Sequence, residues 1–228
     1  KMSKLVPSLL ALVVSCVTTV AFSQEVKGDA KAGEQKNAMC IGCHGIVGYQ
    51  ASFPEIYKVP KISGQSAKYI VASLNAYKSG ERKHPSMRAL SQSLSDQDMA
   101  DLAAYYAQHG VVEGAKLDAA PSKAPNAAVA ALLTKGNCAS CHGANFSTPI
   151  DPSYPKLGGQ HADYLFVALK SYANNTNATW GRGNAIMQGT LKDEKGGPKF
   201  SNAELKQIAN YLGSLECATK TVPQSKFR

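Results

Sequence analysis

The chain has 228 residues, of which 44% are hydrophobic and 18% are charged, and its formal net charge is +9 at pH 7. This length suffices for two small domains, and the lysines are scattered instead of forming the basic run or motif typical of nucleic-acid binding. The moderate basic charge suits acidic protein partners, anionic lipid headgroups, or a solvated lysine-rich face with no single partner.

The first 23 residues have the pattern of an export signal. Lys1 and Lys4 precede an apolar stretch at residues 9–14, and residues 21–23, Ala-Phe-Ser, resemble a small-residue cleavage site. Polar residues interrupt the apolar run, so it is weak as a membrane span of roughly 20 apolar residues. An uncleaved anchor and a lipoprotein site at Cys16 are the alternatives. We expect a periplasmic mature chain with a charge of 9 minus 2, or +7, possessing no later membrane span.

Two copies of the pattern Cys-x-x-Cys-His, at residues 40–44 and 138–142, lie 98 positions apart. The pattern is typical of covalent c-type haem attachment. Its two thiols add to the two vinyl groups of one haem, and the histidine that follows them reaches the iron. The sequence therefore predicts two covalently bound c-type haems, with these attachment and proximal residues: Cys40, Cys43, His44, Cys138, Cys141 and His142.

A lone Cys-x-x-Cys can also be a zinc half-site, a dithiol redox pair or a disulfide. Zinc ribbons usually separate their cysteine pairs by about 15 to 20 residues, much less than the gap here. Neither zinc nor dithiol chemistry explains a histidine directly after both pairs. Outside the motifs, only Cys16 and Cys217 remain, so the mature chain has no disulfide framework, and Cys217 is interpreted as an unpaired thiol.

An internal repeat extends well beyond the cysteines. Residues 60–65, Pro-Lys-Ile-Ser-Gly-Gln, match residues 155–160, Pro-Lys-Leu-Gly-Gly-Gln, at an offset of 95. At the same offset each copy continues into a helical pattern with matching tyrosine and leucine positions. These positions are Tyr69, Leu74 and Tyr77 in the first copy and Tyr164, Leu169 and Tyr172 in the second. Their spacing predicts one helix face packed inward in each copy.

A further helix closes each half. Ser95 with Asp98, and Ser201 with Glu204, match the pattern of an amino-terminal capping box. An apolar stripe at helical spacing follows each of them, and strand patterns are scarce. We therefore expect an all-α protein with two domains at residues 24–113 and 128–216, a linker at 114–127 and a flexible basic tail at 217–228.

The methionines give candidates for the distal iron ligands. Met187 is the only methionine downstream of the second haem motif, and it matches Met87 at an offset of 100. Met99 aligns with Leu205 on the apolar face of the closing helix and is predicted to be core. Met39 directly precedes Cys40 and is poorly placed to reach the other side of the same ring. Met87 and Met187 are therefore the predicted distal ligands, because histidine with methionine is a cytochrome c pairing.

Three histidines are alternative distal ligands. His84 lies three residues before Met87, and His161 lies at the start of a helix, but neither has a histidine at the matching position of the other copy. His109 lies at the end of a helix, where the helix dipole favours a cation. We interpret all three as structural or surface residues.

Taken together, these motifs resemble those of the dihaem cytochromes c of the c4 type, which have two class I cytochrome c domains in tandem. The resemblance covers roughly residues 28–215. It implies that the carbonyls of Pro60 and Pro155 accept hydrogen bonds from the proximal histidines. It also implies that Arg82 and Arg182 lie near the haem propionates, with ordinary exposed arginines as the alternative.

The same resemblance implies an exported electron carrier, and not an enzyme. Such a chain passes electrons to a terminal oxidase or another respiratory acceptor, with possible peripheral contact to the membrane and no small-molecule substrate. Iron held by histidine and methionine has no vacant position for a substrate. A cytochrome subunit of a dehydrogenase or flavocytochrome complex is the first alternative, and a dihaem peroxidase is the second.

Overall fold

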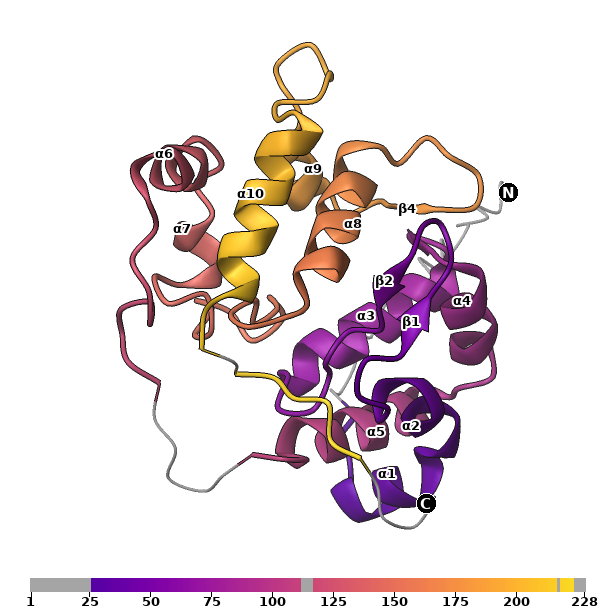
Figure 1. Ribbon diagram of the computed structural model, residues 1–228. Coiled ribbons are helices and arrows are strands. Elements are labelled where there is room, and N and C mark those ends of the chain that lie inside the picture. The colour runs from indigo at the N-terminus through magenta and orange to yellow at the C-terminus, as the bar shows by residue number, and fades with distance from the viewer. Residues whose placement is uncertain (1–25, 112–116, 217, 224–228) are drawn as a thin grey trace, which may run out of the picture.

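The computed structural model describes residues 26–111, 117–216 and 218–223, which form two mostly helical halves (Figure 1). The predicted export signal and Cys217 lie outside these residues. The first half contains α1 Ala30–Lys36, α2 Ala38–His44, β1 Gln50–Ala51, β2 Tyr57–Lys58, α3 Ala67–Ser79, β3 Arg82–Lys83, α4 Pro85–Gln92 and α5 Asp96–Gln108. The second contains α6 Ala127–Lys135, α7 Ala139–His142, α8 Ala162–Ala173, β4 Gly181–Arg182, α9 Ala185–Leu191 and α10 Asn202–Gly213.

Helix α5 organises the first half. Its start carries the predicted capping box of Ser95 and Asp98, and Met99 behind it is fully buried, as expected for a core residue. Helix α1 crosses α5 so closely that a Cβ added at Gly33 would lie 2.1 Å from the carbonyl oxygen of Asp101. The buried core lies between α5 and α3 and includes Ile70, Leu102, Ala103, Tyr105 and Tyr106.

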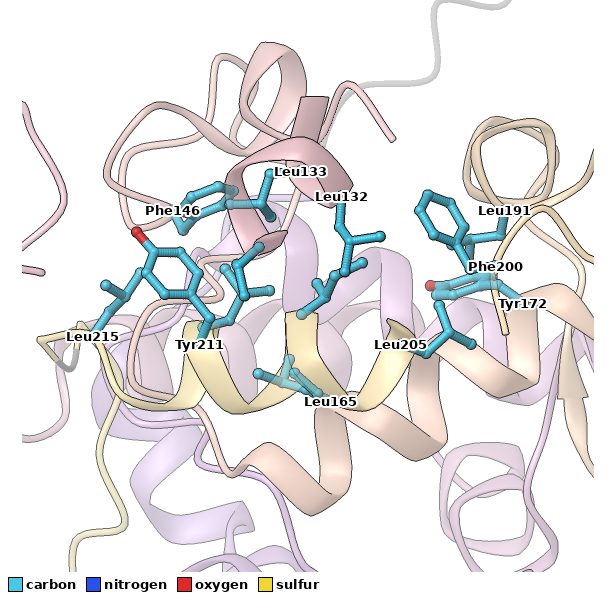
Figure 2. Close-up of a cluster of buried hydrophobic side chains, with 14 residues drawn as sticks. Leu132, Leu133, Phe146, Leu165, Tyr172, Leu191, Phe200, Leu205, Tyr211 and Leu215 are labelled. Atoms are coloured by element: carbon cyan, nitrogen blue, oxygen red, sulfur yellow. The ribbon is translucent and has the colours of Figure 1, made fainter. Parts of the chain in front are cut away.

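Helix α10 has the equivalent place in the second half. The predicted capping box of Ser201 and Glu204 is present at its start. Leu205, Tyr211 and residues between them pack against α6 and α8, as the side chains along α10 in Figure 2 show. The predicted apolar stripes of both closing helices are thus buried, and burial of such apolar surface is the main stabilising contribution to each half.

The two halves contact each other through several elements. Strands β3 and β4, one from each half, pair antiparallel. The hairpin of β1 and β2 lies against α8, where Lys58 Nζ is 3.3 Å from an oxygen of Asp163 and Lys170 Nζ is 2.6 Å from an oxygen of Glu55. The interface between the halves is therefore held by both strand pairing and ion pairs.

Segments outside the two helical halves also lie along them. Residues 117–126 precede α6, and backbone oxygens of Asp118 and Lys123 accept hydrogen bonds from Asn145 and Tyr211 of the second half. The tail was expected to be flexible, but residues 218–223 lie on the first half, where Lys220 pairs with Ser63. The difference arises because the backbone of Lys220 pairs with that of Ser63 in the first half, and the composition of the tail does not reveal such pairing. Among the described residues, no helix has the length and apolar character to cross a membrane.

Candidate haem-binding sites

The first haem motif lies on α2, and its histidine is oriented by a backbone carbonyl. The Nδ1–H of His44 donates a hydrogen bond to the carbonyl oxygen of Pro60 at 2.8 Å. Burial lowers the pKa of His44, although the bond to Pro60 opposes this effect. The ring is therefore neutral at pH 7, with its proton on Nδ1, and its Nε2 lone pair is available to a metal.

The second motif repeats this geometry on α7. The Nδ1–H of His142 donates to the carbonyl oxygen of Pro155 at 3.1 Å, and the side chain is buried. Burial again lowers the pKa of the imidazole, with the carbonyl opposing it. Both prolines begin the repeated hexapeptide, so this repeat places one acceptor beside each candidate iron ligand.

The four motif cysteines form no disulfide bonds. Cys40 packs against the core of the first half and Cys138 against the core of the second. Burial, with a smaller contribution from Cys43, raises the pKa of Cys40 to about 11, and burial also raises the pKa of Cys138. Reactive dithiols have lowered thiol pKa values, so the dithiol interpretation is disfavoured. A free thiol pair followed by an oriented neutral histidine fits covalent haem, whose iron takes the histidine and whose vinyl groups take the thiols.

Both candidate distal methionines lie in the first turn of a short helix. The backbone N–H of Met87 donates to Nδ1 of His84 at 3.3 Å, and that of Met187 donates to Oδ1 of Asn184 at 3.1 Å. His84 and Asn184 are thus the N-caps of α4 and α9. His84 and Asn184 occupy matching positions in the two copies, and each caps the helix that carries a candidate methionine. Met187 also packs against the core of the second half.

The three histidines that are alternative distal ligands have the following contacts and positions in the structure. Because Nδ1 of His84 accepts from a backbone N–H, the proton of the neutral ring is on Nε2, which donates to Tyr57 Oη at 3.0 Å. His109 bonds Ser63 through Nδ1 at 2.9 Å and stacks on Tyr105. His161 is the N-cap residue of α8 and makes no side-chain capping bond. His84 and His109 are therefore held by partners within the first half.

Arg82 and Arg182 lie at the interface between the halves, and neither is an ordinary exposed arginine. Arg182 is buried, and its Nη2 donates to Tyr164 Oη at 3.1 Å. Arg82 is half-buried and bonds across the interface to Tyr172 Oη at 3.4 Å. Each guanidinium also lies over two tyrosine rings of its own half. Neither makes an ion pair with a carboxylate within the described residues.

The repeated hexapeptides dock on each other, a contact that the repeat alone does not predict. The side-chain amide of Gln160 donates to the Lys61 carbonyl at 2.8 Å and accepts from the Lys61 N–H at 3.0 Å. Gln65 makes the same two bonds with Lys156, at 3.1 and 3.0 Å. Each lysine follows the proline whose carbonyl orients a candidate iron ligand. The only sequence feature that could have indicated this docking role is the glutamine at the end of both hexapeptides, Gln65 and Gln160.

Comparisons with known proteins identify the family of the chain. The cytochrome c family model matches residues 30–109 and 127–216. Cytochrome c4 of Pseudomonas aeruginosa is 30% identical over 208 residues, which are 90% of this chain and 98% of that relative. The solved cytochrome c4 of Acidithiobacillus ferrooxidans is 26% identical, with a TM-score of 0.55 over 78% of this chain and 99% of that one.

A third relative is named for its electron donor. The thiosulfate dehydrogenase electron acceptor of Stutzerimonas stutzeri is 28% identical over 175 residues, 73% of this chain and 77% of that relative. The matches confirm the expected all-α fold of two tandem cytochrome c domains and the two covalently bound c-type haems. The chain belongs to the cytochrome c family, in which it is a dihaem electron carrier of the cytochrome c4 type.

Proposed function

We propose that the protein carries single electrons between redox proteins in the periplasm through two haems with closed histidine and methionine ligation. When bound, haem supplies one-electron chemistry between its ferric and ferrous states. His44 with Met87 would hold the iron of the first haem, and His142 with Met187 that of the second. The observation that carries this proposal is that each half contains both a histidine oriented by a proline carbonyl and a methionine in the first turn of a capped helix.

Pro60 and Pro155 have a supporting role in this proposal. A histidine that donates its second N–H to a carbonyl is held in one tautomer and one orientation, and the bond increases its basicity as a ligand. Both carbonyls are in place at 2.8 and 3.1 Å. They would keep the imidazole fixed while the iron changes its charge.

Arg82 and Arg182 would interact with haem propionates. Removal of a guanidinium from water is costly unless an anion or hydrogen-bond acceptors compensate it. Tyrosine hydroxyls satisfy some of the donors here, but they do not balance the two positive charges. Propionates would provide the missing negative charge and would bind the arginines by charge-assisted hydrogen bonds.

We propose a membrane respiratory complex, such as a terminal oxidase, as the electron acceptor, reached from the periplasm with or without peripheral contact to the membrane. A dehydrogenase as the electron donor is a compatible second proposal. The relative named as a thiosulfate dehydrogenase electron acceptor supports it. The excess of lysine and arginine over acidic residues favours partners with acidic docking surfaces.

Absorption spectra of the haem-loaded protein test the ligation. We expect two haems per chain, a charge-transfer band from methionine to ferric iron, and no spectral change when carbon monoxide is added to the reduced protein. Met87→Ala and Met187→Ala should each open one haem to carbon monoxide, whereas Met99→Leu should open neither. Binding of carbon monoxide to half the haem of the unmodified protein would contradict the proposal and would favour a peroxidase.

A further inference from the structure

Residues 218–223, here called the C-terminal strap, leave the second half after α10 and lie along the first half (Figure 1). The Ser63 N–H donates to the Lys220 carbonyl at 3.2 Å, and the Lys220 N–H donates to the Ser63 carbonyl at 2.8 Å. Thr219, between the strap's first residue and this bridge, is fully buried. The strap is therefore packed into the first half as well as paired with it.

In the second half, the backbone N–H equivalent to that of Ser63 is hydrogen-bonded within the same half. Gly158 occupies the place of Ser63 in the repeated hexapeptide, and its N–H donates to the carbonyl of Phe146 at 2.8 Å. Phe146 belongs to the loop that follows the second haem motif. The first half instead takes the corresponding acceptor from Lys220, at the other end of the chain. The strap thus substitutes in the first half for a contact that is internal to the second.

The strap contacts the segment that orients the first proximal histidine. Ser63 lies three positions after Pro60, whose carbonyl accepts the hydrogen bond of His44. The Ser63 hydroxyl bonds His109 at the end of α5, and the Gly64 N–H donates to the Tyr106 carbonyl in the same helix. Ser63 and Gly64 are therefore bonded to α5 and its C-cap, and Ser63 is also paired with the strap.

Gly64 shows how closely the strap approaches this segment. Its φ is +82°, a conformation that favours glycine, and a Cβ added there would lie 2.8 Å from the Ala218 carbonyl oxygen. A side chain at this position would push against the strap. The first residue of the strap therefore lies against the hexapeptide, and Lys220 pairs with the residue before Gly64.

We propose that the C-terminal strap positions residues 60–64 and excludes water behind His44, so that the reduction potential of the first haem depends on the end of the chain. This inference rests on the proposed function, because it requires iron at His44. Release of the strap would admit water near the first haem, and greater exposure stabilises the more highly charged ferric state. The potential of the first haem should then fall, while that of the second stays unchanged.

The matched variants Lys220→Pro and Lys220→Ala test the strap in the full haem-loaded chain. Proline removes the N–H that donates to Ser63, whereas alanine keeps both backbone bonds and changes only an exposed side chain. Redox titrations would be made in a Met187→His background, which moves the second potential downward and so identifies the first. We expect a lower first potential with proline, no shift with alanine, and faster exchange of the Ser63 amide hydrogen only with proline.

A protease site inserted after Glu216 gives a second measurement that does not depend on folding of the proline variant. The chain is folded and loaded with haem, and the strap is cut afterwards. A fall of the first potential on cleavage supports the inference. Equal shifts of both potentials, or no shift, would overturn it while the methionine-to-iron band stayed intact. Absence of that band before cleavage would instead count against the proposed function.

Discussion

Arg82 and Arg182 lie directly opposite each other in the antiparallel pairing of β3 with β4, each from a different half of the chain. Two like charges in such a register repel each other, and the repulsion is stronger in a partly buried site than in water. Tyrosine hydroxyls and rings surround both guanidiniums, but no carboxylate of the described chain pairs with them. The two guanidiniums therefore lack a carboxylate partner among the described residues, and the carboxylates of two bound haems would suit them.

Removal of one of these charges should change a haem potential. A nearby positive charge stabilises ferrous haem over ferric haem, so Arg182→Met should lower the potential by tens of millivolts, where ~59 mV is a tenfold change in a one-electron equilibrium constant. Arg182→Lys keeps the charge but loses the planar fork, and should shift the potential less. Spectroscopic redox titration measures both. Equal potentials in all three proteins would place the propionates elsewhere.

Much of the fold could be predicted because its determinants are local in the sequence. The capping boxes at Ser95 and Ser201, the apolar stripes behind them and the burial of Met99 follow from helical spacing alone. The haem motifs likewise contain their chemistry within five consecutive residues. Such patterns are visible without knowledge of how the two halves are arranged.

The interface could not be predicted, because it depends on how two copies of one pattern meet. The helical spacing of Tyr77 and Tyr172 predicts an inward face, and Tyr172 is indeed buried in the core of the second half. That both rings also contact the interface arginines does not follow from the spacing. The repeat identified the hexapeptides without showing that Gln65 and Gln160 join them. No sequence pattern predicts the strap, because its hydrogen bonds with Ser63 are backbone bonds that any residue except proline can make.

The contribution of the reciprocal hydrogen bonds between the hexapeptides to stability can be measured with a double-mutant cycle. Gln65→Ala and Gln160→Ala each remove the two partly buried hydrogen bonds to the other hexapeptide, together with a bond to the next residue's N–H, and each should lower the free energy of unfolding by roughly 1–3 kcal/mol. The two sites act on one interface, so their effects should be less than additive. Calorimetry should show separate transitions of the two halves in the double variant. The exposed Gln108→Ala is the control, and an equal loss there would argue against a docking role.

The cap of α9 should affect Met187, the proposed distal ligand of the second haem. Asn184→Ala removes the acceptor for the Met187 N–H, and loss of an N-cap typically costs about 1 kcal/mol. Asn184→Ser keeps a capping oxygen and serves as the matched control. We expect the alanine variant, but not the serine variant, to bind carbon monoxide at the second reduced haem more readily, because frayed α9 releases Met187 more often. Identical binding curves for both variants would show that the cap does not control ligation.

Asp101 should make the stability of the first half depend on pH. Its buried carboxylate accepts hydrogen bonds from Lys36 Nζ at 2.6 Å, the Asp29 N–H at 2.8 Å and Gln97 at 2.8 Å. Lys36, followed by the Asp29 N–H, lowers the pKa of this carboxyl. Because the pKa is lower in the folded than in the unfolded chain, its stabilisation is present above the unfolded pKa of about 4 and is lost as pH falls through the folded value.

Asp101→Asn removes this charge and tests the pH dependence directly. At pH 7 the variant should lose roughly 1–3 kcal/mol in denaturant unfolding of the haem-loaded protein, because Lys36 and the Asp29 N–H lose a charged acceptor. In acid the two unfolding free energies should converge, since the wild-type carboxyl becomes protonated. Asp96→Asn, an exposed change in the same helix, should cost less at pH 7. A difference between Asp101 and its asparagine variant that stayed constant with pH would mean that packing, and not the charge, holds α1 on α5.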